Sequence, residues 1–219
     1  IHERLVGSEM CIRDRLCTKP TLIQQALLHY ERGICAEDAF SAHGKRAFIM
    51  SHVLDMTGAP IVLVSAVPVL RSMGYEVLVL GPSDGGSLHL FLDAGASVIT
   101  RSSCRNVSDA WGMALCADFV IANTVVMARA VRALSGTAVP VLWWLHDAFA
   151  GYPHIAHQIP TQLGENVRVY SVGSHAANAM RAVRPEFEIR PLIYGLPDYA
   201  AENFVRTDLG YNRGRPLFA

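Results

Sequence analysis

The sequence predicts an α/β fold, a Rossmann-like parallel sheet with helices on both faces. Apolar runs typical of strands alternate with stretches of helical periodicity, at intervals of roughly 20 to 29 residues. This alternation favours right-handed βαβ crossovers, which produce a parallel sheet that helices cover on both sides. With 219 residues, of which 51% are hydrophobic and 17% charged, the chain can bury the core that such a sheet needs.

Composition excludes several classes of protein. The formal net charge is zero, from 19 basic and 19 acidic residues, so no nucleic-acid track or polybasic membrane patch is expected. The five cysteines lack C-x-x-C spacing and indicate reduced thiols of a cytoplasmic protein. The most apolar run, 59–70, is too short to span a bilayer. We expect a cytoplasmic protein, with peripheral association at the inner face of the membrane left open.

The chain opens with residues 1–16, which lack periodicity and are expected to be a non-native or disordered leader. The Rossmann-like domain is expected to cover 17–197 and to begin with an amphipathic helix over 20–32, which Gly33 ends. The first strand is expected at about 46–52. A loop containing Gly58 then leads into a helix over 60–73, entered at Pro60, in which Pro68 should introduce a kink.

The pattern then repeats down the chain. It predicts strands at 75–80, 97–101, 118–122, 139–145, 167–172 and 188–194, and helices at about 87–94, 106–115, 125–134, 153–163 and 174–184. Residues 198–214 are polar and rich in turn formers, which suits an interdomain linker. Residues 215–219 are expected to be the truncated start of a second, donor-binding domain.

The loop after the first strand is the first candidate binding site, because open parallel sheets bind ligands at the carboxyl ends of their strands. Gly58 lets the backbone approach a ligand closely, and Pro60 suits a first helical position. The N–H groups of Ile61 and Val62 are expected to face the strand ends, where a phosphate could use them. G-x-G-x-x-G and P-loop spacings are both absent, so a plain connecting turn fits this loop equally well.

The remaining strand exits carry further polar or small groups, namely Asp84-Gly85-Gly86, Asn123-Thr124, His146-Asp147 and Gly173-Ser174-His175. A neutral imidazole at His146, next to Trp143 and Trp144, could hydrogen-bond a sugar hydroxyl. The alternative is that Asp147 caps the next helix and His146 is an ordinary strand-end histidine. A zinc site formed by His146, His154 and His157 lacks any matching spacing.

Structural roles compete at the weaker positions. Thr124 precedes an apolar helical run and could be its cap, Ser174 could be an N-cap whose helix end also faces the cleft, and Asp84 could stabilise its glycine-rich turn. The sequence shows no nucleophile elbow, Cys-His pair or pair of carboxylates, so hydrolase chemistry has little support.

Four pieces, Ser51 to Pro60, Gly74 to Leu80, Ala122-Asn-Thr124 and Trp143 to Asp147, resemble in this order the N-terminal domain of family 4 glycosyltransferases. The similarity covers about residues 45–200, and that family comprises retaining enzymes of the GT-B fold. The resemblance implies that Gly58 and Ala59 lie near the donor diphosphate and that His146 contacts the reacting sugar as the catalytic residue. It further implies acceptor or sugar binding by Asp84, Gly85, Asn123, Asp147 and Ser174.

The resemblance also implies transfer of a hexose, with retention, from a nucleotide sugar to a glycan or lipid-linked acceptor, with no metal ion or other cofactor. The basic pair and the two glutamates of the second domain would lie beyond Ala219, so the chain as given is expected to be inactive or nearly so. A stand-alone nucleotide or sugar-phosphate binding module and a sugar-nucleotide epimerase remain alternatives. A nicotinamide-dependent oxidoreductase is disfavoured, because it needs three glycines after the first strand. The glycosyltransferase assignment requires that Gly58 and His146 lie on the same side of the molecule and face one shared opening.

Overall fold

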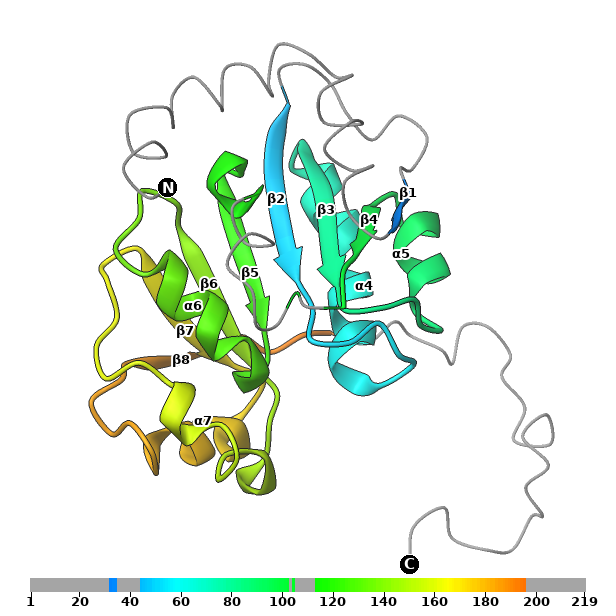
Figure 1. The fold of residues 1–219 in the computed structure, drawn as a ribbon. Helices are drawn as coiled ribbons and strands as arrows, with labels where there is room; N and C mark the ends of the chain where they lie inside the picture. The colour runs from blue at the N-terminus through cyan, green and yellow to red at the C-terminus, as the bar shows by residue number, and fades with distance from the viewer. Residues whose placement is uncertain (1–31, 35–43, 103, 105–112, 196–219) are drawn as a thin grey trace, which may run out of the picture.

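The computed structural model describes residues 32–34, 44–102, 104 and 113–195. Within these residues eight strands form one sheet, in the order β1-β4-β3-β2-β5-β6-β7-β8 (Figure 1). The predicted Rossmann-like parallel sheet is confirmed. Its parallel strands are β2 (Lys45–Met50), β3 (Tyr75–Gly81), β4 (Ser97–Thr100), β5 (Phe119–Asn123), β6 (Val141–Leu145), β7 (Val167–Ser171) and β8 (Ile189–Pro191).

One strand was not predicted. Arg32–Ile34 forms β1, which pairs antiparallel with β4 at the edge of the sheet. Gly33 therefore lies in a strand and does not end a helix there. The predicted helix at 20–32 lies outside the described residues apart from Arg32. The leader at 1–16, most of the helix predicted at 106–115, the linker at 198–214 and the segment at 215–219 also lie outside them.

Helices cover both faces of the sheet (Figure 1). The helical elements are α4 (Gly58–Ser72), α5 (Leu88–Asp93), α6 (Ala128–Leu134) and α7 (Ser174–Arg181), with 3-10 turns η2 (Val125–Met127), η3 (Phe149–Gly151) and η4 (Ala156–Gln158). Apolar residues of α4 and α5 pack in one core with Val79, whereas those of α6 and α7 pack in another with Val169. Alternate residues of β2 to β7 contribute to the two cores, as the period of a strand requires.

The helix predicted over 153–163 is wrong. This segment forms only the short turn η4, and the chain leaves it with Ile159 extended, at ψ 122°. Pro160 explains the ending, since the residue before a proline is disfavoured in the helical region. The last strand is also shorter than predicted: β8 ends at Pro191, and among the described residues only the N–H of Leu192 continues the ladder, donating to the Ser171 carbonyl at 2.8 Å.

Helix α4 begins two residues earlier than predicted. Thr57 is its N-cap in an extended conformation, and the N–H of Ile61 already donates to the Thr57 carbonyl at 3.2 Å. The expectation that Ile61 and Val62 would offer N–H groups to a ligand is therefore wrong. Because Pro60 has no N–H, the available donors of the first turn are those of Gly58 and Ala59. Pro68 lies inside α4 on its exposed side.

The strand order places a topological switch point between β2 and β5. From β2 the chain moves to one side through β3 and β4, then returns to add β5 to β8 on the other side. Ligands bind at such a switch point, outside the carboxyl ends of the strands. We call this side of the sheet the carboxyl edge, and the side where the parallel strands begin the amino edge. In Figure 1 the arrowheads of β2, β3 and β5 point toward the carboxyl edge, where α4 begins.

Among the helices that the structure describes, none combines the length and the apolar character needed to cross a membrane.

Candidate functional site

Backbone contacts tie the exits of β5 and β6 together at the carboxyl edge. The N–H of Thr124, just after β5, donates to the Trp144 carbonyl at 2.8 Å. The N–H of Val125 donates to Asp147 Oδ2, after β6, at 2.6 Å. Register places Asn123 directly beside Trp144. The side chains that follow the two strands are therefore held in one region.

Asn123, the last residue of β5, is fully buried with an unsatisfied amide. Its side chain is 0% exposed, and neither its Oδ1 nor its Nδ2 has a hydrogen-bond partner among the described residues. Buried polar groups are nearly always partnered in native proteins, because an unmade hydrogen bond in the interior costs about 1 to 3 kcal/mol. An amide in this state next to the switch point indicates a functional position.

Thr124, the next residue, has a strained backbone with φ of 70°. A β-branched residue rarely adopts this conformation, which costs on the order of 1 to 3 kcal/mol. Three hydrogen bonds hold it in place. Its N–H donates to the Trp144 carbonyl, its carbonyl accepts from Trp143 Nε1 at 2.8 Å, and its hydroxyl accepts from the Val126 N–H at 3.3 Å. The predicted cap role of Thr124 is thus confirmed, and the strain adds a second mark of function at this strand end.

His146 is half-buried directly after β6, with its ring centroid 5.0 Å from that of Trp144. Burial and, to a smaller extent, the positive charge of nearby His52 lower the pKa of His146 to about 4. The imidazole is therefore neutral at pH 7 and has one donor and one acceptor nitrogen. Its Nε2 is buried and finds no partner within the described part of the chain. Because β2, β5 and β6 are parallel neighbours, the exits of β2 and β6 lie on the same edge of the sheet.

Asp147 acts as a cap, but not of the helix that was expected. Its carboxylate accepts from Val125, so it caps the η2 turn after β5 and not the helix that follows in sequence. Burial raises the pKa of Asp147, against the effect of backbone N–H groups of Val125, Asp147 and His146 that stabilise the charged form. The carboxylate is thus engaged in joining the two strand exits, which weakens its candidacy as a direct sugar ligand.

Gly58 and Ala59 form the first turn of α4 at the carboxyl edge. A side chain at Gly58 would meet no atom within 4 Å, so the glycine faces open space. The first turn contains no acidic residue. Unpaired N–H groups and the helix dipole favour an anion at such a helix start.

Asp84 and Gly85 lie in the loop between β3 and α5, which packs against the loop after β2. A Cβ on Gly85 would collide with the Leu54 carbonyl, and that carbonyl accepts from both the N–H and the hydroxyl of Ser87, at 2.8 and 2.7 Å. Packing of the two loops therefore accounts for Gly85. Asp84 is exposed on the same loop.

Ser174 is the first residue of α7 and is exposed. The N-cap is Gly173, and no side-chain cap is formed, so the prediction of Ser174 as N-cap is wrong by one residue. The ring of His175 packs edge-on against Phe149, with centroids 6.1 Å apart. The start of α7 therefore adjoins the turn after His146 and Asp147.

Trp144 connects this region to the segment after β8. Its Nε1 donates to the Leu192 carbonyl at 3.2 Å, and its ring lies 6.4 Å from that of Tyr194. The residues at 192–195 thus contact the same tryptophan that packs on His146.

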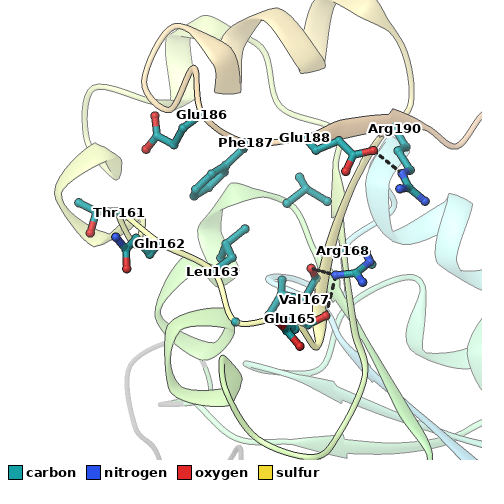
Figure 2. Close-up of a pocket in the computed structure, with 12 residues that line it drawn as sticks. Thr161, Gln162, Leu163, Glu165, Val167, Arg168, Glu186, Phe187, Glu188 and Arg190 are labelled. Atoms are coloured by element: carbon teal, nitrogen blue, oxygen red, sulfur yellow. Dashed lines mark hydrogen bonds and ion pairs between the residues drawn. The ribbon is translucent and has the colours of Figure 1, made fainter.

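A pocket of about 390 Å³ lies elsewhere, at the amino edge (Figure 2). It contains none of the site residues predicted from sequence. Its lining comes from the segments that lead into β7 and β8, namely Thr161, Gln162, Leu163, Gly164, Glu165, Val167, Arg168, Val169, Glu186, Phe187, Glu188 and Arg190.

Within the ranges the structure describes, no group of three or more His, Cys, Asp or Glu side chains could hold a metal ion, and His146, His154 and His157 are among the residues searched. Independence from metal stays a prediction. The strand-exit rule selected His52 as the start of the exit 52–58 but assigned it no role of its own. The burial of Tyr152 has no signal in the sequence.

Comparisons with known proteins agree with this fold. A family model described as Glycosyl-transferase family 4 matches residues 43–184. The fold is similar to that of Anabaena Alr3699/HepE in complex with UDP-glucose, with a TM-score of 0.56 and 14% identity over 77% of this chain and 50% of that chain. The same protein in complex with UDP and glucose gives 0.54 and 16% over the same shares. The chain thus spans about half the length of these structures. No curated protein sequence matches it significantly.

Proposed function

The chain belongs to glycosyltransferase family 4, and from this we propose that it is the acceptor-side domain of a retaining hexosyltransferase. In this proposal the complete enzyme transfers a hexose from a nucleotide sugar to a glycan or lipid-linked acceptor, without a metal ion. A second domain completes the donor site, so this chain alone transfers little or no sugar. The proposal includes a cytoplasmic location at or near the inner face of the membrane.

The observation that carries the proposal is the pairing of two kinds of group at one edge of the sheet. Asn123 and the neutral His146 offer buried, unpartnered polar atoms among the described residues, which suit uncharged hydroxyl groups. The start of α4 offers the N–H groups of Gly58 and Ala59, which suit a phosphate. A nucleotide sugar presents hydroxyls and phosphates side by side.

The proximity of His52 and His146 supports a shared opening for these groups. His52 belongs to the loop that leads from β2 to Gly58, and its charge acts on His146 after β6. In the proposed reaction His146 binds a hydroxyl of the transferred sugar. The N–H groups of Gly58 and Ala59 stabilise charge that develops on the departing diphosphate.

The related structures suggest the first donor to test. Alr3699/HepE is described in complex with UDP-glucose and with UDP and glucose. We therefore propose a uridine diphosphate sugar as the first probe, while the identity of the sugar and of the acceptor stays open.

Calorimetric titration of the 219-residue chain with UDP-glucose and UDP tests the proposal. We expect binding of UDP-glucose that His146→Ala weakens about tenfold, the loss of one hydrogen bond in a buried site. His89→Ala, an exposed position on α5, is the matched control. UDP-glucose binding that is equal in His146→Ala and wild type would contradict the proposed role of His146.

Product analysis separates the alternatives. Incubation of the chain with UDP-glucose should give neither transfer nor a changed sugar, because the second domain is needed for chemistry. Conversion of UDP-glucose to an epimer would instead support the sugar-nucleotide epimerase. Sugar transfer by this chain alone would contradict the two-domain proposal.

A further inference from the structure

The chain that follows β8 returns along the carboxyl edge to Trp144. The N–H of Leu192 donates to the Ser171 carbonyl of β7 at 2.8 Å, and its carbonyl accepts from Trp144 Nε1 of β6 at 3.2 Å. Leu192 packs, partly buried, against the core that contains both Trp144 and the apolar residues of α4. This return segment (192–195) therefore starts on the face of the sheet that α4 covers, and in Figure 1 the chain leaves β8 in the direction of α4.

Tyr194, in the return segment, leaves much of its surface open although its ring has a fixed partner. The ring centroid lies 6.4 Å from that of Trp144, and the two rings meet edge-on at 74°. The residue is nevertheless 38% exposed. An aromatic ring that serves only stability buries most of its large apolar surface. The exposed surface of Tyr194 is thus available to a ligand.

The indole of Trp144 also contacts His146. The two ring centroids are 5.0 Å apart, and the buried Nε2 of His146 has no partner among the described residues. Register places Asn123, whose buried amide likewise has no partner in the described ranges, beside Trp144. Trp144 is therefore the common neighbour of two unsatisfied polar groups and one exposed aromatic ring.

A hexose presents the two kinds of surface that these groups can bind. Its hydroxyls can exchange a hydrogen bond with a neutral imidazole. Its C–H groups form an apolar face, which packs on the negatively polarised face of an aromatic ring. Phosphate groups have no such face, so an exposed ring at this place favours the sugar end of a nucleotide sugar.

We propose that Tyr194 is a further sugar-binding residue, whose ring packs on the C–H face of the hexose that His146 contacts. This inference rests on the proposed function, because the hexose at His146 is part of that function. Trp144 contacts both side chains and so fixes the spacing between the ring and the imidazole. Tyr194 acts on the affinity for the sugar and takes no part in proton transfer.

Calorimetric titration of the 219-residue chain with UDP-glucose and with UDP tests this role. Tyr194→Ala should raise the dissociation constant of UDP-glucose about fivefold, the loss of one aromatic contact, and leave that of UDP unchanged. Tyr194→Phe keeps the ring and should bind both as the wild type does. Ile193→Ala, at the preceding residue of the return segment, is the matched control at 76% exposure and should change neither constant.

Free glucose is the second probe, because an aromatic platform for a sugar needs no nucleotide. In an NMR titration of the wild-type chain, glucose should shift the ring-proton signals of Tyr194. If the chain binds neither UDP-glucose nor UDP, the proposed function fails, whereas a glucose-dependent shift at Tyr194 still supports the sugar contact. No shift of the Tyr194 signals by glucose would overturn the contact.

Three results of the calorimetry would also overturn the role of Tyr194. The first is UDP-glucose binding that Tyr194→Ala leaves unchanged. The second is an equal loss of UDP-glucose and UDP binding in Tyr194→Ala, because that would show a structural role of the ring. The third is a loss in Ile193→Ala as large as that in Tyr194→Ala.

Discussion

The two edges of the sheet differ in how their polar groups are satisfied. At the carboxyl edge, Asn123 is fully buried with an unpartnered amide, and Thr124 is held at φ of 70°. At the amino edge, the pocket of Figure 2 has arginines with local partners. Arg168 donates to the Glu165 carbonyl at 2.6 Å, and Arg190 pairs with Glu188 at 2.8 Å.

In this molecule, a pocket alone is weaker support for a functional site than buried polar groups that lack hydrogen-bond partners among the described residues. The amino-edge pocket has volume, but its arginines are engaged by neighbours in the chain. The carboxyl edge bears unmade hydrogen bonds and backbone strain, which a protein retains only where the surrounding structure enforces them. The following variants test this difference between the two edges.

The largest effect is expected from Trp143→Ala. Trp143 is 0% exposed and its indole holds the carbonyl of strained Thr124. We expect a loss of about 3 to 5 kcal/mol in the free energy of unfolding, measured with urea. Phe187→Ala, in the wall of the amino-edge pocket at 8% exposure, should cost less. An equal or larger loss at Phe187 would remove the contrast between the edges.

Asp147→Ala should have the next largest effect. The variant leaves the Val125 N–H without its acceptor, and loss of such a cap costs about 2 kcal/mol. Asp147→Asn keeps an acceptor oxygen and should retain most of the stability. Glu188→Ala, in the exposed ion pair of the amino edge, should not change the urea midpoint measurably. Equal midpoints for all three variants would show that Asp147 does not join the two strand exits.

Asn123→Leu should change stability and binding in opposite directions. Removing an unsatisfied buried amide stabilises the free chain by about 1 kcal/mol, if the leucine fits the space. UDP-glucose binding should weaken at the same time. Asn166→Leu is the matched control from another loop, where the amide donates to the carbonyls of Leu134 and Val139, so it should destabilise. Lower stability in both variants would indicate that Asn123 is satisfied in solution.

At pH 7 the smallest effect is expected at His146, whose contribution to stability changes only on acid titration. Its folded pKa of about 4 lies below the ordinary histidine value of 6.5, so the unfolded chain binds the proton first. This contribution to stability is therefore present above pH 6.5 and is lost as pH falls toward 4. His146→Gln should flatten that part of the pH dependence of the urea midpoint, and His89→Gln should not. Parallel profiles for wild type and His146→Gln would contradict the lowered pKa.

Much of the fold was predictable from sequence, because buried parallel strands are apolar runs that end in turn residues. The strands β2 to β7 lie within about two residues of their predicted bounds. The short β1 and the missing helix at 153–163 were not predicted. Three residues are too few for a periodic signal, and the effect of Pro160 on Ile159 overrides a helical pattern.

The site was predictable only in outline. The strand-exit rule selected Asn123 and His146, which the structure brings to one edge. It could not reveal that Asp147 reaches back 22 residues to Val125, that Thr124 is strained, or that Tyr152 is buried. Each of these depends on contacts between elements, which a single sequence does not encode locally.

Trp144 gives the molecule an optical reporter. Its indole touches His146 on one side and is hydrogen-bonded to Leu192 beyond β8 on the other. Indole emission responds to the polarity and charge around the ring, so a molecule that settles against His146 will alter the fluorescence of Trp144. Ligand binding beside His146 can therefore be followed by intrinsic tryptophan fluorescence, without attaching a label.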